Sequence, residues 1–120
     1  MKNEIIEKEN IDIEDMIYEI DGKEIMLDSD LAKLYHVETK RINEAVKNNP
    51  EKFPERFSFI LTTSQKEILK SKFSTANINS KSRVNPRVFT EQGIYMLATI
   101  LKSKEAIQVS IDIMDTKRDN

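Results

Sequence analysis

Hydrophobic and polar positions near the start of the chain follow the pattern of a β-hairpin. Two short runs rich in isoleucine are separated by Asp21-Gly22, a residue pair that accepts the positive φ angles of a tight two-residue turn. This pattern predicts antiparallel strands at about residues 17–20 and 23–27. Residues 1–16 are acidic and show only a loose helical pattern, so we expect an N-terminal arm there.

A pattern of two short helices follows the hairpin. Asp28 is a good N-cap residue, because its carboxylate accepts a hydrogen bond from an otherwise unpaired backbone N–H. It predicts a first helix that continues through Tyr35. Thr39 is placed to cap a second helix in the same way. This helix is expected to end near Asn48, since Pro50 disfavours helix in the residue before it.

The middle of the chain predicts a strand, a helix and a loop. Apolar residues alternate at 57–61, which is typical of a strand. Thr62 and Gln65 have the spacing of a capping box, which predicts a helix to about Lys72. Residues 73–86 are rich in Ser, Thr and Asn, and we expect them to form a loop.

The last third predicts a short strand and two helices. Arg87–Phe89 has the composition of a strand, and Thr90 and Ser103 are placed to cap the helices. On the last helix, helical spacing brings Ile107, Ile111 and Met114 to one face. The whole pattern predicts an α+β fold: one small domain over residues 17–120, expected to be the N-terminal part of a longer protein.

The spacing of the first two helices fits a helix-turn-helix. Ala32 is the small residue needed where the helices cross, and Val37 is the apolar residue that joins them after the turn. The second helix supplies the buried face with Ile42, Ala45 and Val46. The turn requires a left-handed residue, and His36 occupies that position, where glycine is less strained.

The opposite face of the second helix carries candidate DNA contacts. Arginine pairs with guanine and asparagine with adenine in the major groove, so Lys40, Arg41 and Asn43 are expected to contact bases, with Lys47 on the same face. Thr39 is expected to contact a phosphate through its hydroxyl or the helix N-terminus. The simpler alternative is a solvated helix face.

Charge is strongly segregated along the chain. Residues 1–30 have a net charge of −8, residues 31–104 of +8 and residues 105–120 of −2. Residues 68–90 contain no acid but five cations, which suits a segment that follows a phosphate backbone or enters a minor groove. A solubilising loop is the alternative. The candidate DNA contacts here are Lys72, Lys81, Arg83 and Arg87.

Composition excludes several kinds of site. The chain has no cysteine and a single histidine, so thiol chemistry and sites built from two imidazoles are impossible. The sequence gives no reason to expect a metal or cofactor. Its start is polar and its longest apolar stretch is too short to span a bilayer. We therefore expect a cytoplasmic protein of a bacterial host or phage-infected cell, with no membrane partner.

Three segments resemble one known family. The segment MLDSDLAKLYHVETKRINEAVKNNPEKFPERFSFILT resembles the core of the phage and prophage ORF6N domain, which is related to the KilA-N and Bro-N families. IYEIDGKEI and VFTEQGIYMLATILKSKEAIQVSIDIM are also similar to it. The resemblance covers about residues 15–115 and implies DNA binding in a phage regulator or antirepressor. The family pattern commonly has glycine at position 36 and Arg/Gly-rich sequence at 76–86.

Two other functions compete with DNA binding. Asp21 with Lys23 superficially matches a fragment of metal-dependent nucleases, and Asp28 with Asp30 suggests a cation pair. Hairpin and cap formation explain these residues more simply, so we expect no enzyme. The second alternative is an interaction module that antagonises a repressor without binding DNA. The expected partners are thus double-stranded DNA, with a second copy of the chain and a repressor protein left open.

Overall fold

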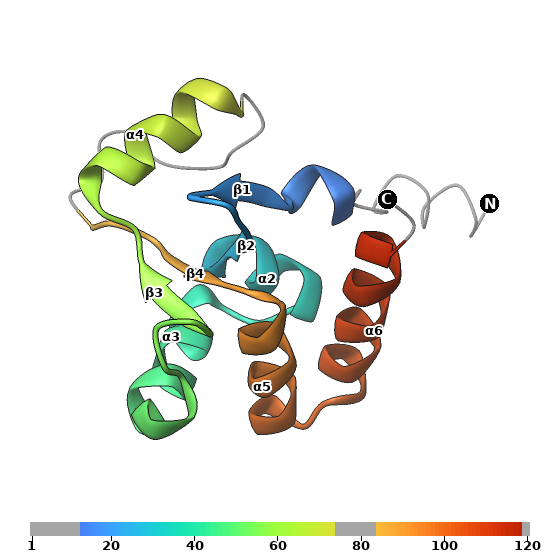
Figure 1. The fold of residues 1–120 in the computed structure, drawn as a ribbon. Coiled ribbons are helices and arrows are strands. Elements are labelled where there is room, and N and C mark those ends of the chain that lie inside the picture. The colour runs from blue at the N-terminus through green and yellow to red at the C-terminus, as the bar shows by residue number, and fades with distance from the viewer. Residues whose placement is uncertain (1–12, 74–83, 119–120) are drawn as a thin grey trace.

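The computed structural model describes residues 13–73 and 84–118 of the chain, which form an α+β fold around one antiparallel sheet (Figure 1). The strand order is β1-β2-β4-β3, so the last strand in sequence lies between the second and third. The elements are η1 (Ile13–Met16), β1 (Tyr18–Ile20), β2 (Lys23–Leu27), α2 (Asp28–Tyr35), α3 (Thr39–Asn48), η2 (Pro50–Lys52), β3 (Ser58–Ile60), α4 (Thr63–Lys72), β4 (Arg87–Phe89), α5 (Glu91–Leu101) and α6 (Lys104–Arg118).

The hairpin forms as the sequence predicts. Tyr18 pairs with Ile25 and Ile20 with Lys23. Asp21 has φ 51° and Gly22 has φ 79°, the two positive angles of a type I′ turn. η1, at the end of the segment expected to be an acidic arm, buries Met16 in the core. Residues 1–12 lie outside the described residues.

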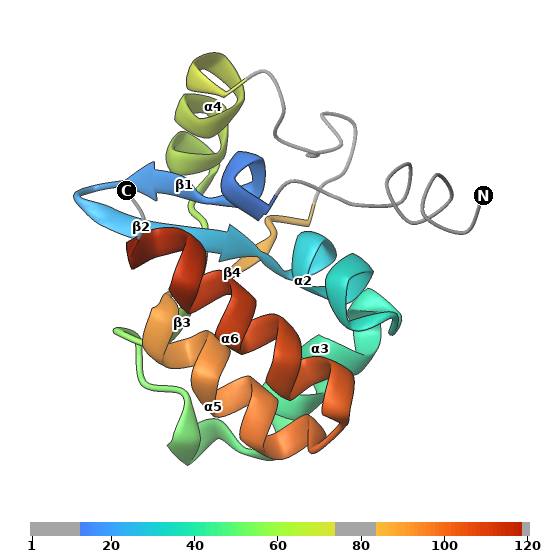
Figure 2. The same cartoon turned by 90° about the vertical axis from the view of Figure 1, so that its right-hand side faces the viewer.

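The sheet separates two hydrophobic clusters, because successive side chains of a strand point to opposite faces. Met26 of β2 and Phe89 of β4 face the layer of α2, α3, α5 and α6. Leu27 and Val88, the next pair in the register of the two strands, face the other cluster with Leu69 of α4. Figures 1 and 2 show α4 on one side of the sheet and α5 and α6 on the other.

Three of the predicted caps are confirmed. Thr62 and Gln65 form a complete capping box, in which each side chain accepts from the other residue's backbone N–H, at 3.1 and 2.9 Å. Thr90 Oγ1 accepts from Gly93 N at 3.4 Å. Ser103 Oγ accepts from Ala106 N at 3.0 Å. These local hydrogen bonds determine where α4, α5 and α6 begin.

Two of the predicted caps are wrong by one residue. Leu27 and Glu38 are the N-cap residues of α2 and α3, and neither makes a side-chain cap. Asp28 and Thr39 are already the first residues of their helices. At α2 the reason is the sheet: Leu27 pairs with Val88 and is fully buried, so the strand passes directly into the helix. Asp28 still lies at the positive end of the helix dipole.

Candidate nucleic-acid interface

Helices α2 and α3 are joined by a three-residue turn that ends in a Schellman motif. The Val37 N–H donates to Ala32 O at 3.0 Å and the His36 N–H to Lys33 O at 3.3 Å, which is the hydrogen-bond pair of that motif. His36 has φ 59° and ψ 43°. The left-handed residue predicted from the sequence is therefore confirmed at His36.

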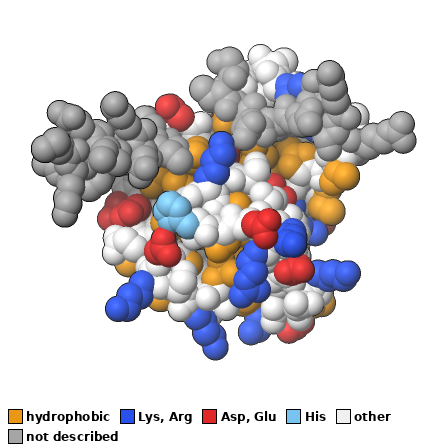
Figure 3. Space-filling model, turned by 180° about the vertical axis from the view of Figure 1, so that it is seen from behind, with side chains coloured by type: hydrophobic (Ala, Val, Ile, Leu, Met, Phe, Trp, Pro, Cys, Tyr) orange, Lys and Arg blue, Asp and Glu red, His pale blue; other side chains and the backbone are white. Residues whose placement is uncertain are grey.

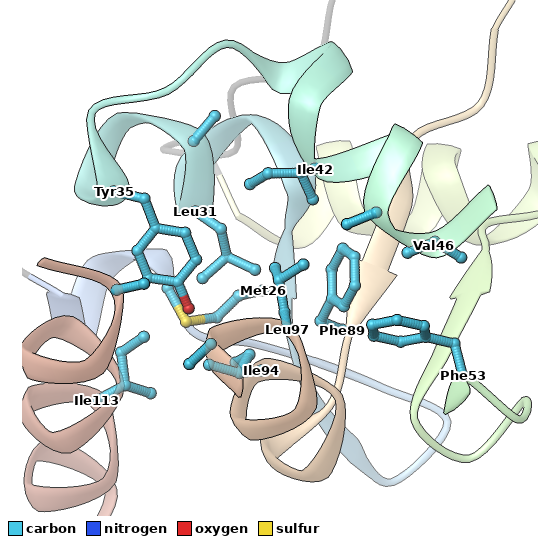
Figure 4. Packing of buried hydrophobic residues seen from close by; sticks show 14 of the residues in the cluster. Met26, Leu31, Tyr35, Ile42, Val46, Phe53, Phe89, Ile94, Leu97 and Ile113 are labelled. Atoms are coloured by element: carbon cyan, nitrogen blue, oxygen red, sulfur yellow. The ribbon is translucent and has the colours of Figure 1, made fainter. Parts of the chain in front are cut away.

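One face of the two-helix unit is buried as predicted. Ala32, Ile42, Ala45 and Val46 are buried, and Val37 packs against the same cluster. Figure 4 shows the side chains of this cluster, in which Leu31, Ile42 and Val46 point toward Leu97 and the aromatic rings of Phe53 and Phe89. The two rings meet edge to face with centroids 6.1 Å apart. The core thus fixes which side of α3 faces outward.

The outward side of α3 is mainly basic. Lys40, Arg41 and Lys47 are exposed, and Glu44 is the acidic residue among them. The ion pair of Lys40 with Glu38 is long, at 3.9 Å, and both side chains are well exposed. Figure 3 shows the face that contains the α2–α3 turn, identified by the pale blue histidine, with Lys and Arg side chains projecting from it and acidic ones between them.

Asn43 does not project outward as the sequence suggests. It is half-buried, and its Nδ2 donates both to Asp28 Oδ2 at 2.9 Å and to Thr39 O at 3.2 Å. An amide nitrogen has two donors, so both are used inside the protein. Reading an adenine requires a free amide donor. Asn43 instead joins α3 to the start of α2. Thr39 is half-buried, and its backbone carbonyl accepts the second hydrogen bond of the Asn43 amide.

Arg87 is brought to the same place from a distant part of the sequence. It lies on β4, and its Nη1 donates to Ser58 Oγ at 3.0 Å. Burial lowers the pKa of Arg87, while the negative charge of Asp28 raises it. An arginine stays protonated under such conditions, so Arg87 is a half-buried cation within electrostatic reach of Asp28.

Asp28 has another role than the helix cap that the sequence predicts. Its Oδ1 accepts from Ser29 N at 2.7 Å and its Oδ2 from Asn43. It therefore connects α2, α3 and, through charge, β4. No local signal reveals this role, because Asn43 is fifteen residues away in sequence and Arg87 lies on a strand placed by the sheet.

Lys72 does not lie with these residues. Lys72 is exposed at the end of α4, and both ribbon views place α4 across the sheet from α3 (Figures 1 and 2). Lys81 and Arg83, with most of the predicted 73–86 loop, lie outside the described residues.

A buried carboxyl group lies beside this unit. Asp30 of α2 is only 3% exposed, and its Oδ2 has no hydrogen-bond partner. Burial raises the pKa of Asp30 to about 6, Lys33 lowers it and Asp28 raises it further. Within the described parts of the chain, no group of acidic or histidine side chains is arranged to hold a metal ion. Asp30 is a buried acid, and its burial is the main cause of its raised pKa.

The fold and this surface define a small α+β domain with an exposed basic helix. The sequence matches the model of the ORF6N domain family over residues 15–100, which is more than half of the chain. The chain belongs to the ORF6N domain family. Comparisons with curated proteins and with solved structures gave no match. In the ranges 13–73 and 84–118, no helix has both the length and the apolar character needed to cross a membrane.

Proposed function

We propose that this domain binds double-stranded DNA through a helix-turn-helix formed by α2 and α3, as part of a phage- or prophage-derived regulator. The observation that carries the proposal is the division of α3 into two faces. Ile42 and Val46 anchor one face in the core, while Lys40, Arg41 and Lys47 are exposed on the other. A helix held in this way on a rigid core is the element that enters a major groove.

The contacts divide into two classes. Arg41 is the candidate base reader, because a guanidinium pairs with guanine through two hydrogen bonds. Glu44 is a second candidate, because a carboxylate accepts from the cytosine amino group. Lys40 and Lys47 are suited to phosphates, which supply most of the affinity. Arg87, whose charge interacts with that of Asp28, is suited to a backbone contact.

DNA binding also implies the compartment in which the protein acts. Such a domain acts where the DNA is, in the cytoplasm of a bacterial host or a phage-infected cell. The proposal includes no catalytic step. Asp21, which matches part of a nuclease motif, is a turn residue whose Oδ2 accepts from Gln65 Nε2 at 2.7 Å. Cleavage of DNA by the purified chain with magnesium would contradict this part of the proposal.

The test is a salt titration with a labelled duplex of random sequence. We expect log affinity to fall linearly with log salt between about 50 and 200 mM, by about 0.9 for each phosphate contacted. Lys47→Ala should reduce that slope by about 0.9. Lys23→Gln, on the hairpin, removes a charge from an exposed position outside α3 and should leave the slope unchanged. Absence of binding at about 50 mM salt would overturn the proposal.

Sequence preference tests the assignment of base contacts. Selection from a random DNA pool should enrich one motif, and Arg41→Ala should relax the preference at one position by about 1–3 kcal/mol. Asn43→Ala should lower the overall affinity without relaxing the preference at any single base position, because its amide holds α3 against α2. A motif that is lost with Asn43→Ala in a folded protein, but kept with Arg41→Ala, would reverse the two roles.

A further inference from the structure

Helices α5 and α6 form a groove that is mostly apolar and open to solvent. It has a volume of about 380 Å³ and is lined by side chains of α5 and α6 with the Lys102 position between them. Tyr95, Ile107 and Ile111 are 59%, 50% and 44% exposed. The face formed by Ile107, Ile111 and Met114, which the sequence places on one side of the last helix, therefore borders this groove instead of closing the core.

The groove has an apolar ridge along one of its walls. Ile107, Ile111 and Met114 follow each other at spacings of four and three residues, which is the pattern of a helix that pairs with another helix. The buried small residues Ala98 and Ser110 leave the groove hollow. Because ridge and groove lie side by side, a two-fold rotation places the ridge of one copy in the groove of a second copy, as an isologous interface requires.

Charges beside the ridge are also arranged for a two-fold pairing. Lys104 and Asp115 are exposed near opposite ends of α6. They are eleven residues apart, close to three helical turns, so they lie on the same side of the helix and about 16 Å apart along it. In an antiparallel pairing centred between Val109 and Ser110, Lys104 of each copy lies next to Asp115 of the other.

We propose that this chain forms a homodimer in which the α5–α6 grooves of two copies pair antiparallel. The groove is lined by α5, α6 and the residues that join them, so the pairing leaves the basic face of α3 exposed. The dimer is thus a property beyond DNA binding, and it is measurable without DNA. Failure of one proposal leaves the other standing.

The apolar area suits a reversible dimer. Tyr95, Ile107 and Ile111 expose on the order of 300 Å² of side-chain surface in each copy. Met114 and the polar rim add to this area. The apolar area is below the about 800 Å² per partner that standard specific interfaces bury, which is the size range of weak, transient pairs. We therefore expect dissociation in the micromolar range.

Sedimentation equilibrium of the 120-residue chain across micromolar concentrations tests the dimer. The unmodified chain should show a monomer–dimer equilibrium. Ile111→Asp should weaken it at least about tenfold, because a charge in an apolar contact loses its hydration. Ile68→Asp, on an exposed isoleucine of α4, is the matched control and should sediment as the unmodified chain. Circular dichroism confirms that both variants are folded.

A charge swap tests the antiparallel arrangement. Lys104→Glu alone and Asp115→Lys alone each place like charges together, and each should weaken the dimer several-fold. The double variant, Lys104→Glu with Asp115→Lys, restores opposite charges and should recover the affinity of the unmodified chain. A chain that stays monomeric at all concentrations, or Ile111→Asp and Ile68→Asp with equal effects, would overturn the proposal. Failure of the double variant to recover affinity would overturn the antiparallel pairing.

Discussion

Asn43 of α3 donates a hydrogen bond of 2.9 Å to the Asp28 carboxylate at the first turn of α2. The same amide donates to Thr39 O, one turn earlier in α3. The contact fixes α3 against α2 close to the helix end that carries Lys40 and Arg41. The amide of a residue that the sequence presents as a DNA contact is thus used to join α3 to α2.

The Asn43–Asp28 contact should be measurable by a double-mutant cycle. Hydrogen bonds to charged groups contribute about 1.5–3 kcal/mol, and residues in contact are coupled. We expect a coupling of about 1–2 kcal/mol between Asn43→Ala and Asp28→Ala in urea unfolding. The exposed Gln108–Asp112 pair, at a similar distance of 3.0 Å, is the control, and its coupling should stay below about 0.5 kcal/mol. Equal couplings would show that Asn43 has no special role.

Asp30 should make stability depend on pH between about 4 and 6. Its pKa is raised from 3.8 to about 6 in the folded protein, so the folded state binds more protons than the unfolded state in this interval. The contribution of Asp30 to stability therefore falls as pH rises through the interval, by an upper limit of about 3 kcal/mol. Above about pH 6 the full cost of burying the carboxylate is present.

Asp30→Asn removes this titration and should remove that part of the pH dependence. The measurement is the free energy of unfolding in urea at several pH values between 4 and 7, compared with the unmodified chain. The difference between the two proteins should change in favour of the variant as pH rises. Asp112→Asn, on the surface of α6, is the control. A constant difference across this range would contradict a raised pKa at Asp30.

Gly93 should not tolerate a larger residue. A Cβ atom at this position would lie 1.9 Å from Phe57 O and 2.8 Å from Phe57 C, and backbone atoms cannot move aside as a side-chain tip does. The Thr90 N–H already donates to Phe57 O at 3.0 Å. We expect Gly93→Ala to lower the free energy of unfolding by about 2–3 kcal/mol, measured by chemical denaturation.

Gln92 supplies the control for Gly93. It is exposed on the same turn of α5, so Gln92→Ala should change stability by less than about 0.5 kcal/mol. If Gly93→Ala were as stable as Gln92→Ala, then α5 would have room to move away from the segment before β3, and the close approach at Phe57 would not be needed for the fold.

Replacing His36 by glycine should stabilise the protein, and replacing it by a β-branched residue should destabilise it. The left-handed conformation costs an L-residue about 1–2 kcal/mol, and glycine avoids this cost. Part of the benefit is lost because glycine has more conformational freedom in the unfolded state. We expect His36→Gly to raise the free energy of unfolding by about 0.5 kcal/mol and His36→Val to lower it by about 1 kcal/mol. Thermal or urea unfolding measures both, and the opposite order would exclude strain at this turn.

The sequence by itself determined the elements whose limits depend on local hydrogen bonds and dihedral angles. Asp21-Gly22 specifies the hairpin because both residues accept positive φ. Thr62 with Gln65 specifies the start of α4 because each satisfies the other's backbone N–H. The buried face of α3 also followed from its 3.6-residue periodicity. These features need only neighbours in sequence.

Only the tertiary structure decided what each element meets. Nothing local places β4 between β2 and β3, or brings the Asn43 amide and the charge of Arg87 to Asp28. Periodicity places Ile107 and Ile111 on one face, but the contacts of α5 and α6 leave that face exposed. The physical reason is that side-chain period identifies which residues share a face, whereas burial of that face depends on surfaces supplied by distant parts of the chain.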